Sequence, residues 1–412
     1  MHNKKIAIIA FSFPPFSSGG ITSAHYNLFQ GFKNKGAQIK YFTYGDHHHD
    51  VRYNKNYNEH DDVLRYGTPQ WIFKLLPKLS KLYEMFFIRK PFQYSYQFFN
   101  ILDTMYGSYK INIALKRYKP DILILPDSGS PGFLIKKRKG CKVILISHHN
   151  PSRFLGNPLF GLHSERDAHW ALKFENWTLR KVDHVICPSN YMKKVFLKTY
   201  FYNGLVSVLP NLVDEKTIDA IPVSDIRKIL NLPMDCPVIY IPSGGSIFKG
   251  ARYIFEIIRR IAAAYKKEIG FFISGSNWDQ TLAYELKYLP ENVRLYTPGY
   301  LNYHDNIGLI KSCSFGISPT LIESFGMAIL EANFCGIPMI AFNTGGVEDI
   351  IVDELNGFMV PYLDIESLLN FSIQLIMNEK LLVKLKKTTY NYAQEKFNTE
   401  KIVDKYVQVV MG

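Results

Sequence analysis

The chain of 412 residues is long enough for two or three domains, and its composition, 47% hydrophobic and 21% charged, is that of a globular protein. No apolar run reaches the roughly 18 residues that a membrane-spanning helix needs, which argues against an integral membrane protein. The five cysteines are scattered and none forms a C-x-x-C pair, which argues against a cysteine-based metal site and favours a reduced, cytosolic setting.

The whole chain has a formal net charge of +13, and the positive charge is concentrated in its first half. Residues 1–200 contain 30 Lys and Arg against 13 Asp and Glu, a net charge of +17, which leaves 19 against 23, or −4, for residues 201–412. This asymmetry points to a polyanionic partner of the first half, either nucleic acid or an anionic membrane surface; the alternative is a solvated, lysine-rich surface.

The first 46 residues have the pattern of a strand–helix–strand unit. An apolar run from Ile6 to Phe11 predicts a parallel strand buried on both faces, followed by a helix over 22–35 and a second strand over 38–44. The first turn of this unit is rich in glycine and contains Gly19 and Gly20. Because no G-x-G-x-x-G motif is present, a dinucleotide-dependent dehydrogenase is disfavoured.

Residues 47–67 are polar and include His47, His48, His49 and His60. Imidazole is a common metal ligand, but no carboxylate or cysteine stands at ligand spacing from these histidines. We therefore predict a solvated loop rather than a metal site.

Residues 70–119 form an aromatic and basic helical stretch, in which Pro77 is expected to kink or split the helix. Apolar residues recur at helical spacing, with lysines between them. The apolar positions include Trp71, Leu75, Leu79 and Leu82, and the lysines are Lys74, Lys78 and Lys81. This composition is typical of a helix at a membrane interface, and it fits equally a helical insertion that packs on its own domain.

Two successive sets of strands alternating with helices predict an α/β fold of two doubly wound domains, with ligands at the carboxyl ends of the strands. The first set continues with strands over 120–126, 143–146, 182–187 and 206–209. The second has strands over 238–241, 271–274, 293–296, 315–318 and 339–342, and helices near 251–265, 279–288, 305–311 and 326–335. Residues 215–235 have the composition of a polar linker, and 364–410 of a helical tail.

We expect the first domain to span residues 1–205, with the helical insertion at about 70–119, and the second domain to span 206–390. A C-terminal helix over 391–412 is expected to pack back on the first domain.

The second domain opens with a strand followed by the loop 242–250, which is rich in glycine and ends in Lys249-Gly250. Glycines let backbone N–H groups approach a phosphate, and a lysine supplies a positive point charge. A P-loop is excluded because Gly250, and not Ser or Thr, follows Lys249.

The stretch 318–348 combines a strand end, a loop and a helix that begins at Gly326. The N–H groups at such a helix start form an anion site, and Gly326 lets a ligand come close to the backbone. Glu323 precedes the helix and Glu331 lies inside it, eight residues later. This layout suits a nucleotide diphosphate-sugar, with one acid for the sugar hydroxyls and one for the ribose hydroxyls.

Five motifs occur in an order that resembles the retaining glycosyltransferases of family 4. They are Glu323-x7-Glu331, Lys249-Gly250, Gly345-Gly346-x-Glu348, Pro14-Pro15 with Gly19-Gly20, and Pro210-Asn211-x-Val213-Asp214. The resemblance covers essentially the whole chain apart from the stretch near 47–119. It implies the GT-B fold, in which two Rossmann-like domains face each other across a cleft.

The resemblance also implies roles for individual residues. Glu331 would bind the nucleotide ribose, Glu323 would contact the donor sugar, and Lys249 would neutralise the diphosphate. The expected catalytic residues are Glu323, His148 and Lys249. His148 would lie near the donor sugar, with His149 as the alternative. Backbone contacts to phosphate or sugar would come from Gly19, Gly20, Gly326 and Met327.

One departure from the family pattern concerns the diphosphate. The family usually places an Arg a few residues before the Lys, where this chain has the stretch 243–246. The backbone of Gly245 and Ser246 would stand in for that Arg, or Arg252 would reach the phosphates from the following helix.

The implied activity is retaining transfer of a sugar from a UDP- or GDP-sugar to a lipid-linked or cell-surface glycan, by front-face attack in which the leaving phosphate takes the acceptor's proton. No metal or cofactor is expected, because no D-x-D motif follows a strand; Asp61-Asp62 lies in a polar loop. The expected location is cytoplasmic, peripheral on the inner face of the cell membrane.

Other functions fit the same residues less well. A nucleotide-sugar epimerase or a sugar-phosphate synthase would use the same fold. A nucleic-acid-binding protein is disfavoured, because no recognition motif is present and the second half is acidic.

Overall fold

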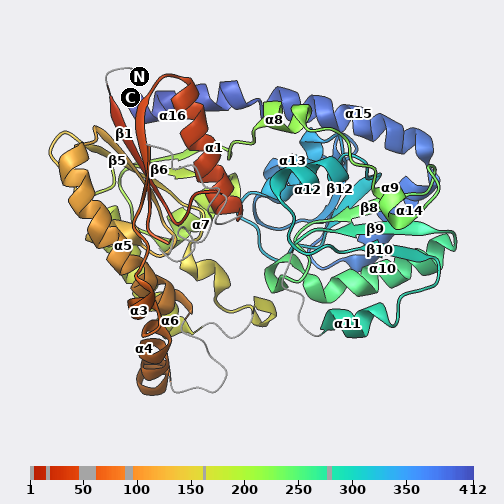
Figure 1. Cartoon of the computed structure of the whole chain (residues 1–412), viewed down its shortest axis with the longest axis horizontal. Helices are drawn as coiled ribbons and strands as arrows, with labels where there is room; N and C mark the ends of the chain where they lie inside the picture. The colour runs from red at the N-terminus through yellow and green to blue at the C-terminus, as the bar shows by residue number, and fades with distance from the viewer. Residues whose placement is uncertain (1–3, 15–18, 46–61, 89–95, 161–163, 276–280) are drawn as a thin grey trace. The chain divides into compact units, whose positions relative to one another are not determined.

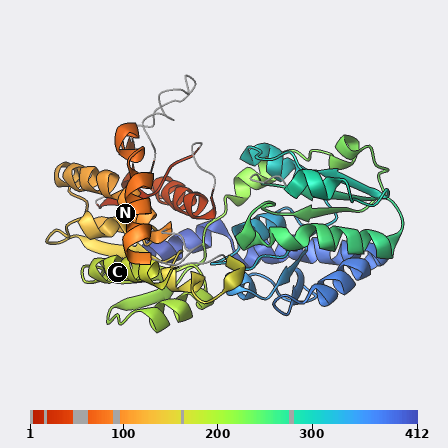
Figure 2. The ribbon, with the colours of Figure 1, turned by 90° about the horizontal axis from the view of Figure 1, so that it is seen from below.

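The computed structural model describes residues 4–14, 19–45, 62–88, 96–160, 164–275 and 281–412 (Figures 1 and 2). The chain divides into two compact units. Unit 1 contains Met1–Leu212 and Glu400–Gly412, and unit 2 contains Val213–Thr399. The histidines at 47–49 and at 60, the Asp61 carboxylate and the loop 276–280 lie outside the described residues.

The division between the units lies at Leu212 rather than at the expected residue 205. The reason is that β7 (Leu205–Val208) pairs with β6 (His184–Cys187) and so belongs to the sheet of unit 1. At the other end, α15 (Glu379–Lys396) is part of unit 2, so only α16 (Thr399–Met411) returns to unit 1, and not the whole of 391–412.

Within the described residues, unit 1 is built on a seven-stranded sheet in the order β3-β2-β1-β4-β5-β6-β7, and each pair of neighbours is parallel. The strands not yet named are β1 (Lys5–Ala10), β2 (Gln38–Thr43), β3 (Val63–Arg65), β4 (Ile122–Pro126) and β5 (Lys142–Ile146). Residues 6–9 of β1 are fully buried, as a continuous apolar run covered on both faces requires.

Helices cover both faces of the sheet of unit 1 (Figure 1). Side chains from α5, α6 and α7 pack with Ala7 and Ile9 of β1 in one apolar cluster. On the other side, α16 meets α1 where Val403 approaches Gly31, and Lys35 pairs with Asp404 over 2.7 Å. The longer helices of unit 1 are α1 (Gly20–Asn34), α5 (Tyr96–Tyr118), α6 (Glu165–Leu179) and α7 (Asn190–Thr199).

Unit 1 also contains short helical turns. These are α3 (Gln70–Phe73), α4 (Leu76–Tyr83), the π-helical turn η1 (Glu84–Ile88), and the 3-10 turns η2 (Pro131–Leu134), η3 (Pro151–Phe154) and η4 (Pro158–Phe160). Pro77 lies in the first turn of α4, directly after the break that separates α4 from α3, as expected for a proline that splits a helix.

The described part of unit 2 has a six-stranded parallel sheet in the order β10-β9-β8-β11-β12-β13. Its strands are β8 (Val238–Ile241), β9 (Ile269–Ile273), β10 (Val293–Tyr296), β11 (Phe315–Ser318), β12 (Met339–Phe342) and β13 (Gly357–Val360). The core helix is α10 (Ala251–Tyr265), which buries Ile254, Ile257, Ile258 and Ile261 at the spacing of one helix face.

The other helices of unit 2 complete its two layers around the sheet. They are α8 (Glu215–Ala220), α9 (Ile226–Leu230), α11 (Thr281–Leu286), α12 (Tyr303–Ile310), α13 (Met327–Phe334) and α14 (Ile365–Met377), with the 3-10 turns η5 (Ile247–Lys249) and η6 (Gly345–Asp349). The prediction of a polar linker over 215–235 is therefore wrong, because α8 and α9 occupy most of it and bury Ile218, Ile226 and Leu230.

In each sheet the order in which successive strands are added reverses at one point. In unit 1 the reversal lies between β1 and β4, and in unit 2 between β8 and β11. In open parallel sheets, ligands bind outside the carboxyl ends of the strands at such a point. The loops after these four strands are therefore where functional residues are expected.

Two further observations bear on function. Among the described residues, no helix combines the length and the apolar character needed to cross a bilayer. The same part of the chain contains no group of three His, Cys, Asp or Glu side chains arranged to hold a metal ion.

Arg227 of α9 fastens the segment 215–235 to the sheet of unit 2. Its guanidinium donates to the carbonyl oxygen of Cys236 (2.8 Å), to that of Ser312 (2.6 Å) and to the hydroxyl of Ser314 (3.2 Å). We predict that Arg227→Ala lowers the stability of unit 2 by about 2–3 kcal/mol, which corresponds to a fall in Tm of about 5–10 °C. Thermal unfolding followed by circular dichroism measures this. Lys228→Ala, at the exposed neighbouring position, is the control, and equal Tm values for the two variants would show that Arg227 has no such role.

Candidate functional site

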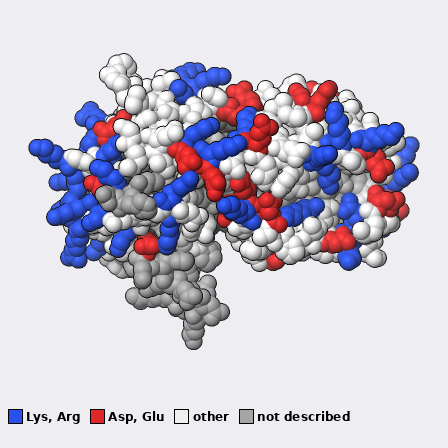
Figure 3. Space-filling view, turned by 90° about the horizontal axis from the view of Figure 1, so that it is seen from above, with Lys and Arg blue, Asp and Glu red and all other residues white. Residues whose placement is uncertain are grey.

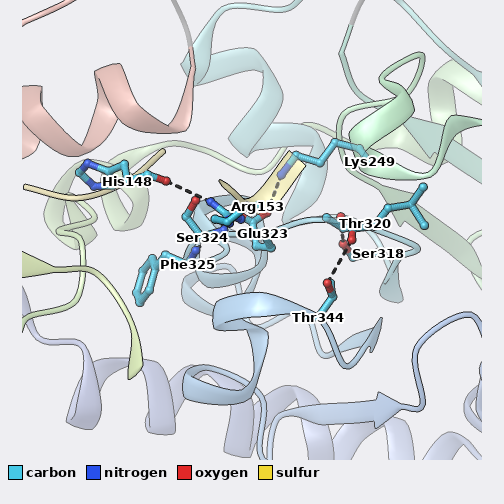
Figure 4. A network of polar contacts seen from close by, with 10 residues as sticks. His148, Arg153, Lys249, Ser318, Thr320, Glu323, Ser324, Phe325 and Thr344 are labelled. Atoms are coloured by element: carbon cyan, nitrogen blue, oxygen red, sulfur yellow. Dashed lines mark hydrogen bonds and ion pairs between the residues drawn. The ribbon is translucent and has the colours of Figure 1, made fainter. Parts of the chain in front are cut away.

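The loops after β8 and β11 bring Lys249 and Glu323 together at the switch point of unit 2. The Lys249 ammonium lies 2.5 Å from Oε2 of Glu323 (Figure 4). The two loops are joined by their backbones, because the N–H groups of Leu321 and Ile322 donate to the carbonyl oxygen of Phe248. The sequence motifs that contain the lysine and the first glutamate are thus parts of one site, although 74 residues separate them.

The Glu323 carboxylate is held on both of its oxygens. Oε1 accepts hydrogen bonds from the backbone N–H groups of Ser324 (3.0 Å) and Phe325 (3.4 Å), while Oε2 accepts from Lys249. The side chain is 15% exposed, and that of Lys249 is 29% exposed. Both charges are therefore held in place, and each side chain keeps part of its surface exposed.

The loop after β12 closes the site from the other side. A Cβ atom at Gly345 would lie 1.8 Å from the carbonyl oxygen of Glu323, and the residue has a φ of 58°. Only glycine therefore fits, and Gly346 donates its N–H to the same carbonyl oxygen. Thr344 also binds this loop, since its hydroxyl donates to the carbonyl oxygen of Leu321 over 3.2 Å.

Helix α13 begins beside this ion pair. Gly326 is its N-cap with a φ of 118°, a value that favours glycine, and Met327 is the first helical residue. The first N–H groups of a helix have no partner within the helix, so the start of α13 can donate to an anion. A negative ligand here would lie next to the Lys249 ammonium.

Glu331 lies one turn into α13. Burial of its carboxyl group raises the pKa of Glu331 from its ordinary value of 4.5 to about 7. The Glu331 carboxylate also lies close enough to β8 to affect Tyr240. The pKa of Tyr240 is raised mainly by burial and in addition by the negative charge of Glu331. The free protein therefore keeps Glu331 partly protonated at neutral pH.

The loop after β8 offers backbone groups in place of an arginine. Gly245 has a φ of 82°, and Ser246 caps the 3-10 turn η5, whose last residue is Lys249. The Gly244 N–H is taken by the carbonyl oxygen of Ser274 at 2.7 Å, which ties this loop to the end of β9. Arg252 is exposed in the first turn of α10.

In unit 1, Asp127 organises the loops at the switch point. It follows β4 directly and is 3% exposed. Its Oδ2 accepts hydrogen bonds from the Ser147 hydroxyl (3.0 Å) and from the backbone N–H groups of His149 (2.8 Å) and Asn150 (3.2 Å). The loop after β5 that carries the two histidines is therefore held by one buried carboxylate.

His148 is buried and His149 is half-buried. Nε2 of His148 donates to Oδ1 of Asn211 at 2.9 Å, and its ring lies 5.3 Å from that of His25. Burial lowers the pKa of both His148 and His25, that of His25 to about 4, so both rings are neutral at pH 7. His149 instead stacks on Phe154, with 4.9 Å between the ring centroids.

Arg153 ties the end of this loop back to its start. The guanidinium of Arg153 donates to the carbonyl oxygens of His148 and His149, both over 3.2 Å (Figure 4). The backbone of His149 is thus held by the buried acid through its N–H and by the arginine through its carbonyl oxygen.

Gly19 and Gly20 lie at the start of α1, at the same edge of the sheet of unit 1. Both are exposed, and the Gly19 carbonyl oxygen accepts the first hydrogen bond of the helix from Ser23. Gly19 has a φ of −115°, which any residue adopts, and among the described residues a Cβ atom there would meet no atom within 4 Å. The described part of unit 1 therefore gives no reason for glycine at this position.

The sequence-predicted residues are thus found in two groups. Lys249, Glu323 and the start of α13 form the group in unit 2, and His148 with the loops around it forms the group in unit 1. Sequence reasoning missed Asp127 and Asn211, which position His148, and also His25. The available signal was an acid directly after a buried strand and an asparagine within the 210–214 motif.

Comparison with known proteins gives the chain's relationships. Residues 18–217 match the family model described as Glycosyltransferase Family 4, and residues 223–392 match the model described as Glycosyl transferases group 1. Together the two matches span both units.

Two curated relatives illustrate the similarity. The chain is 30% identical over 247 residues to the UDP-Gal:alpha-D-GlcNAc-diphosphoundecaprenol alpha-1,3-galactosyltransferase of Escherichia coli, a match covering 55% of this chain and 61% of that protein. It is 24% identical over 216 residues to the phosphatidylinositol N-acetylglucosaminyltransferase gpi3 subunit of Schizosaccharomyces pombe, covering 51% and 45%. These matches span less than two thirds of the length of either relative.

A solved structure shows the same fold. The sucrose-phosphate synthase of Thermosynechococcus elongatus superposes with a TM-score of 0.71 over 99% of this chain and 98% of that chain, at 19% sequence identity. At this identity the likeness concerns the fold alone.

The open position of Gly19 generates a prediction. Gly19→Ala should leave Tm within about 1 °C of the wild type and lower the rate of sugar transfer at least about tenfold, because the added methyl group occupies space that a bound phosphate needs. Steady-state kinetics and thermal unfolding measure the two effects. Gly345→Ala is the contrasting variant and should lower Tm, since its methyl group meets the Glu323 backbone. Full activity of Gly19→Ala would show that no ligand approaches this residue.

The raised pKa of Glu331 predicts how nucleotide binding depends on pH. If Glu331 binds the ribose, the ribose hydroxyls would donate to the ionised carboxylate, which is present above pH 7 and is lost as pH falls through about 7. The Kd for UDP, measured by calorimetry, should therefore be about tenfold higher at pH 6 than at pH 8. Glu331→Gln is the control. The ionisation of UDP itself affects both proteins, but the variant lacks the carboxyl group, so its Kd should change less between pH 6 and pH 8. Parallel profiles for the two proteins would contradict this role.

Proposed function

Because this chain belongs to glycosyltransferase family 4 and has the GT-B fold, we propose that it transfers a sugar from a UDP- or GDP-sugar, with retention of configuration, to a lipid-linked or cell-surface glycan. The observation that carries the proposal is the Lys249–Glu323 ion pair at the start of α13, at the switch point of the sheet of unit 2. It combines a cation and helix N–H groups for a diphosphate with a carboxylate for sugar hydroxyls.

The chemistry in unit 2 is stabilisation of the leaving group. As the glycosidic bond breaks, negative charge builds up on the β-phosphate. Lys249, the N–H groups at Gly326 and Met327, and the backbone of the loop at Gly245 and Ser246 are proposed to stabilise that charge. Glu331 binds the ribose hydroxyls. These residues stabilise the charge without a metal ion, and we propose that none is needed.

The chemistry in unit 1 is positioning. His148 is neutral and buried, so its proposed role is a hydrogen bond with a hydroxyl of the donor sugar and not electrostatic attraction of phosphate. Asp127 and Asn211 act through His148 by fixing the ring and its loop. Gly19 and Gly20 are proposed to lie against the diphosphate.

We propose front-face transfer without a covalent intermediate. The acceptor hydroxyl oxygen forms the new bond to the anomeric carbon, the bond to the diphosphate breaks, and the leaving phosphate oxygen takes the hydroxyl proton. Both Glu323 oxygens already accept hydrogen bonds, which makes this carboxylate a poor nucleophile. A trapped glycosyl-enzyme adduct would contradict this step.

The acceptor class is suggested by the relatives. One is named for a diphosphoundecaprenol-linked sugar and the other for phosphatidylinositol, and both acceptors are lipids. A lipid-linked acceptor implies that the protein works on the cytoplasmic face of the cell membrane as a peripheral protein.

A donor screen tests the function. We predict that one UDP- or GDP-sugar raises Tm by several degrees at saturating concentration, that transfer to a GlcNAc-diphospholipid persists in EDTA, and that Lys249→Ala lowers kcat/KM at least about 100-fold. The anomeric configuration of the product is read by NMR. Steady isomerisation or hydrolysis of the donor without acceptor would favour an epimerase or a sugar-phosphate synthase. Loss of activity in EDTA would contradict the metal-independent mechanism.

A further inference from the structure

Helix α4 has apolar residues on two different sides. Leu76, Ser80 and Tyr83 are buried, and the Tyr83 ring stacks on Phe98 of α5 with 4.1 Å between the ring centroids. Leu75, Leu79 and Leu82 repeat the same spacing one residue earlier, which places them about 100° around the helix. These three leucines are 45%, 47% and 48% exposed, although a soluble helix normally turns such a row inward.

The exposed apolar surface extends beyond α4 at both ends. Trp71 of α3 is 68% exposed, and Met85 and Phe86 of η1 are 60% and 58% exposed. We call the set Trp71, Leu75, Leu79, Leu82, Met85 and Phe86 the α4 apolar face. Among the residues that the structure describes, it is a run of large exposed hydrophobic side chains on one short segment, the kind of patch that marks an interaction site.

Lysines flank this face. Lys74, Lys78 and Lys81 follow the spacing of the leucines and lie next to them on the side away from the buried residues. Lysines beside an apolar row can keep their ammonium groups at the level of phosphate headgroups while the row enters the acyl boundary. The charge complements an anionic lipid surface.

The α4 apolar face lies at the functional edge of unit 1. The Tyr83 hydroxyl donates to the carbonyl oxygen of Arg166 in the first turn of α6, and Phe98 is in the first turn of α5. Both helices begin at the carboxyl edge of the sheet, where the Asp127 and His148 loops also lie. Figure 1 shows α3 and α4 projecting from that edge.

Many of the other basic residues lie at the opposite edge of the sheet, where the strands begin, which we call the basic amino edge. The last turns of α1, α5 and α7 carry Lys33, Lys116, Arg117 and Lys198, and Lys5 and Lys142 begin β1 and β5. Figure 3 shows Lys and Arg gathered over this side of unit 1. The helix dipole favours cations at the carboxyl ends of helices, which gives these residues a structural reason.

From these placements we infer that the α4 apolar face docks into the interface of an anionic phospholipid bilayer, and that the basic amino edge of unit 1 does not. The sequence suggested membrane contact through both features, but they lie at opposite edges of one sheet. The inference rests on the proposed transfer to a lipid-linked acceptor, since it brings the functional edge to the surface that holds the acceptor. A second copy of the chain is a poorer occupant, because pairing two such faces brings the lysines of each row together.

Flotation with vesicles tests the inference on the full-length protein. Vesicles contain phosphatidylcholine with 30% phosphatidylglycerol, a composition chosen at roughly the anionic content that attracts basic segments. The triple variant L75Q/L79Q/L82Q should lower the membrane partition coefficient at least about tenfold. The matched variant K116Q/R117Q/K119Q removes charge from the amino edge, since Lys119 directly follows the last residue of α5 and is exposed. It should change the partition coefficient less than about twofold. The variant K74Q/K78Q/K81Q should lose the dependence on phosphatidylglycerol.

Controls separate docking from folding and from catalysis. The three leucines are exposed, so the triple variant should keep the wild-type Tm and the wild-type rate with a water-soluble, short-chain acceptor. Unchanged flotation of the leucine variant, or release by the amino-edge variant, would overturn the inference. The inference would also be overturned if the wild type bound no vesicles and eluted as a dimer in size-exclusion chromatography, while the leucine variant eluted as a monomer. Absence of transfer with every donor would overturn the proposed function while the flotation result still decides the docking surface.

Discussion

Parallel pairing is the constraint on which both units depend. When every strand runs in the same direction, each connection must cross back over the sheet, so all the loops that follow strands gather at one edge. Where the strand order reverses, the two adjacent loops lead to helices on opposite faces and leave the backbone between them uncovered. In unit 2 these loops follow β8 and β11 and carry Lys249 and Glu323; in unit 1 they follow β1 and β4 and carry Gly19 and Asp127. The chemistry of the candidate site is therefore a consequence of topology before it is a consequence of particular side chains.

The groups placed at these edges are poorly suited to stability alone. Burial raises the pKa of Glu331 and raises that of Glu175, on the buried face of α6 near Asp127, well above its ordinary value. A carboxyl group that titrates near or above neutrality destabilises the folded state at higher pH, relative to an apolar residue of the same size. Lys249 and Glu323 avoid this cost by pairing, and Glu323 also uses its own loop as a donor. The fold thus holds some charges in ion pairs. It buries other carboxyl groups without a cation, and the ionised form of such a group is stabilised only when a ligand donates hydrogen bonds to it.

Much of this arrangement could be predicted from the sequence, because strands buried on both faces appear as continuous apolar runs. The strands at 238–241, 293–296, 315–318 and 339–342 have the predicted bounds. The short strands β3 and β13 were missed: β3 is only partly buried, and each lies at a sheet edge. The α8–α9 segment was taken for a linker because its apolar residues are few and widely spaced. The family motifs identified Lys249, Glu323 and Glu331. Asn211 stands out only as part of the 210–214 motif, and Asp127 only as the residue after a buried strand. Their importance depends on which loops become neighbours in the folded sheet.

The path of the chain through unit 1 has a consequence for its synthesis. Unit 1 is discontinuous: it is left at Leu212 and completed only by α16, whose Ile402, Val403, Tyr406 and Val410 are buried in it. All residues of unit 2 are therefore made before unit 1 has its full core. Until α16 is in place, unit 1 has part of its apolar surface uncovered. The two units therefore become complete in the reverse of the order in which they begin.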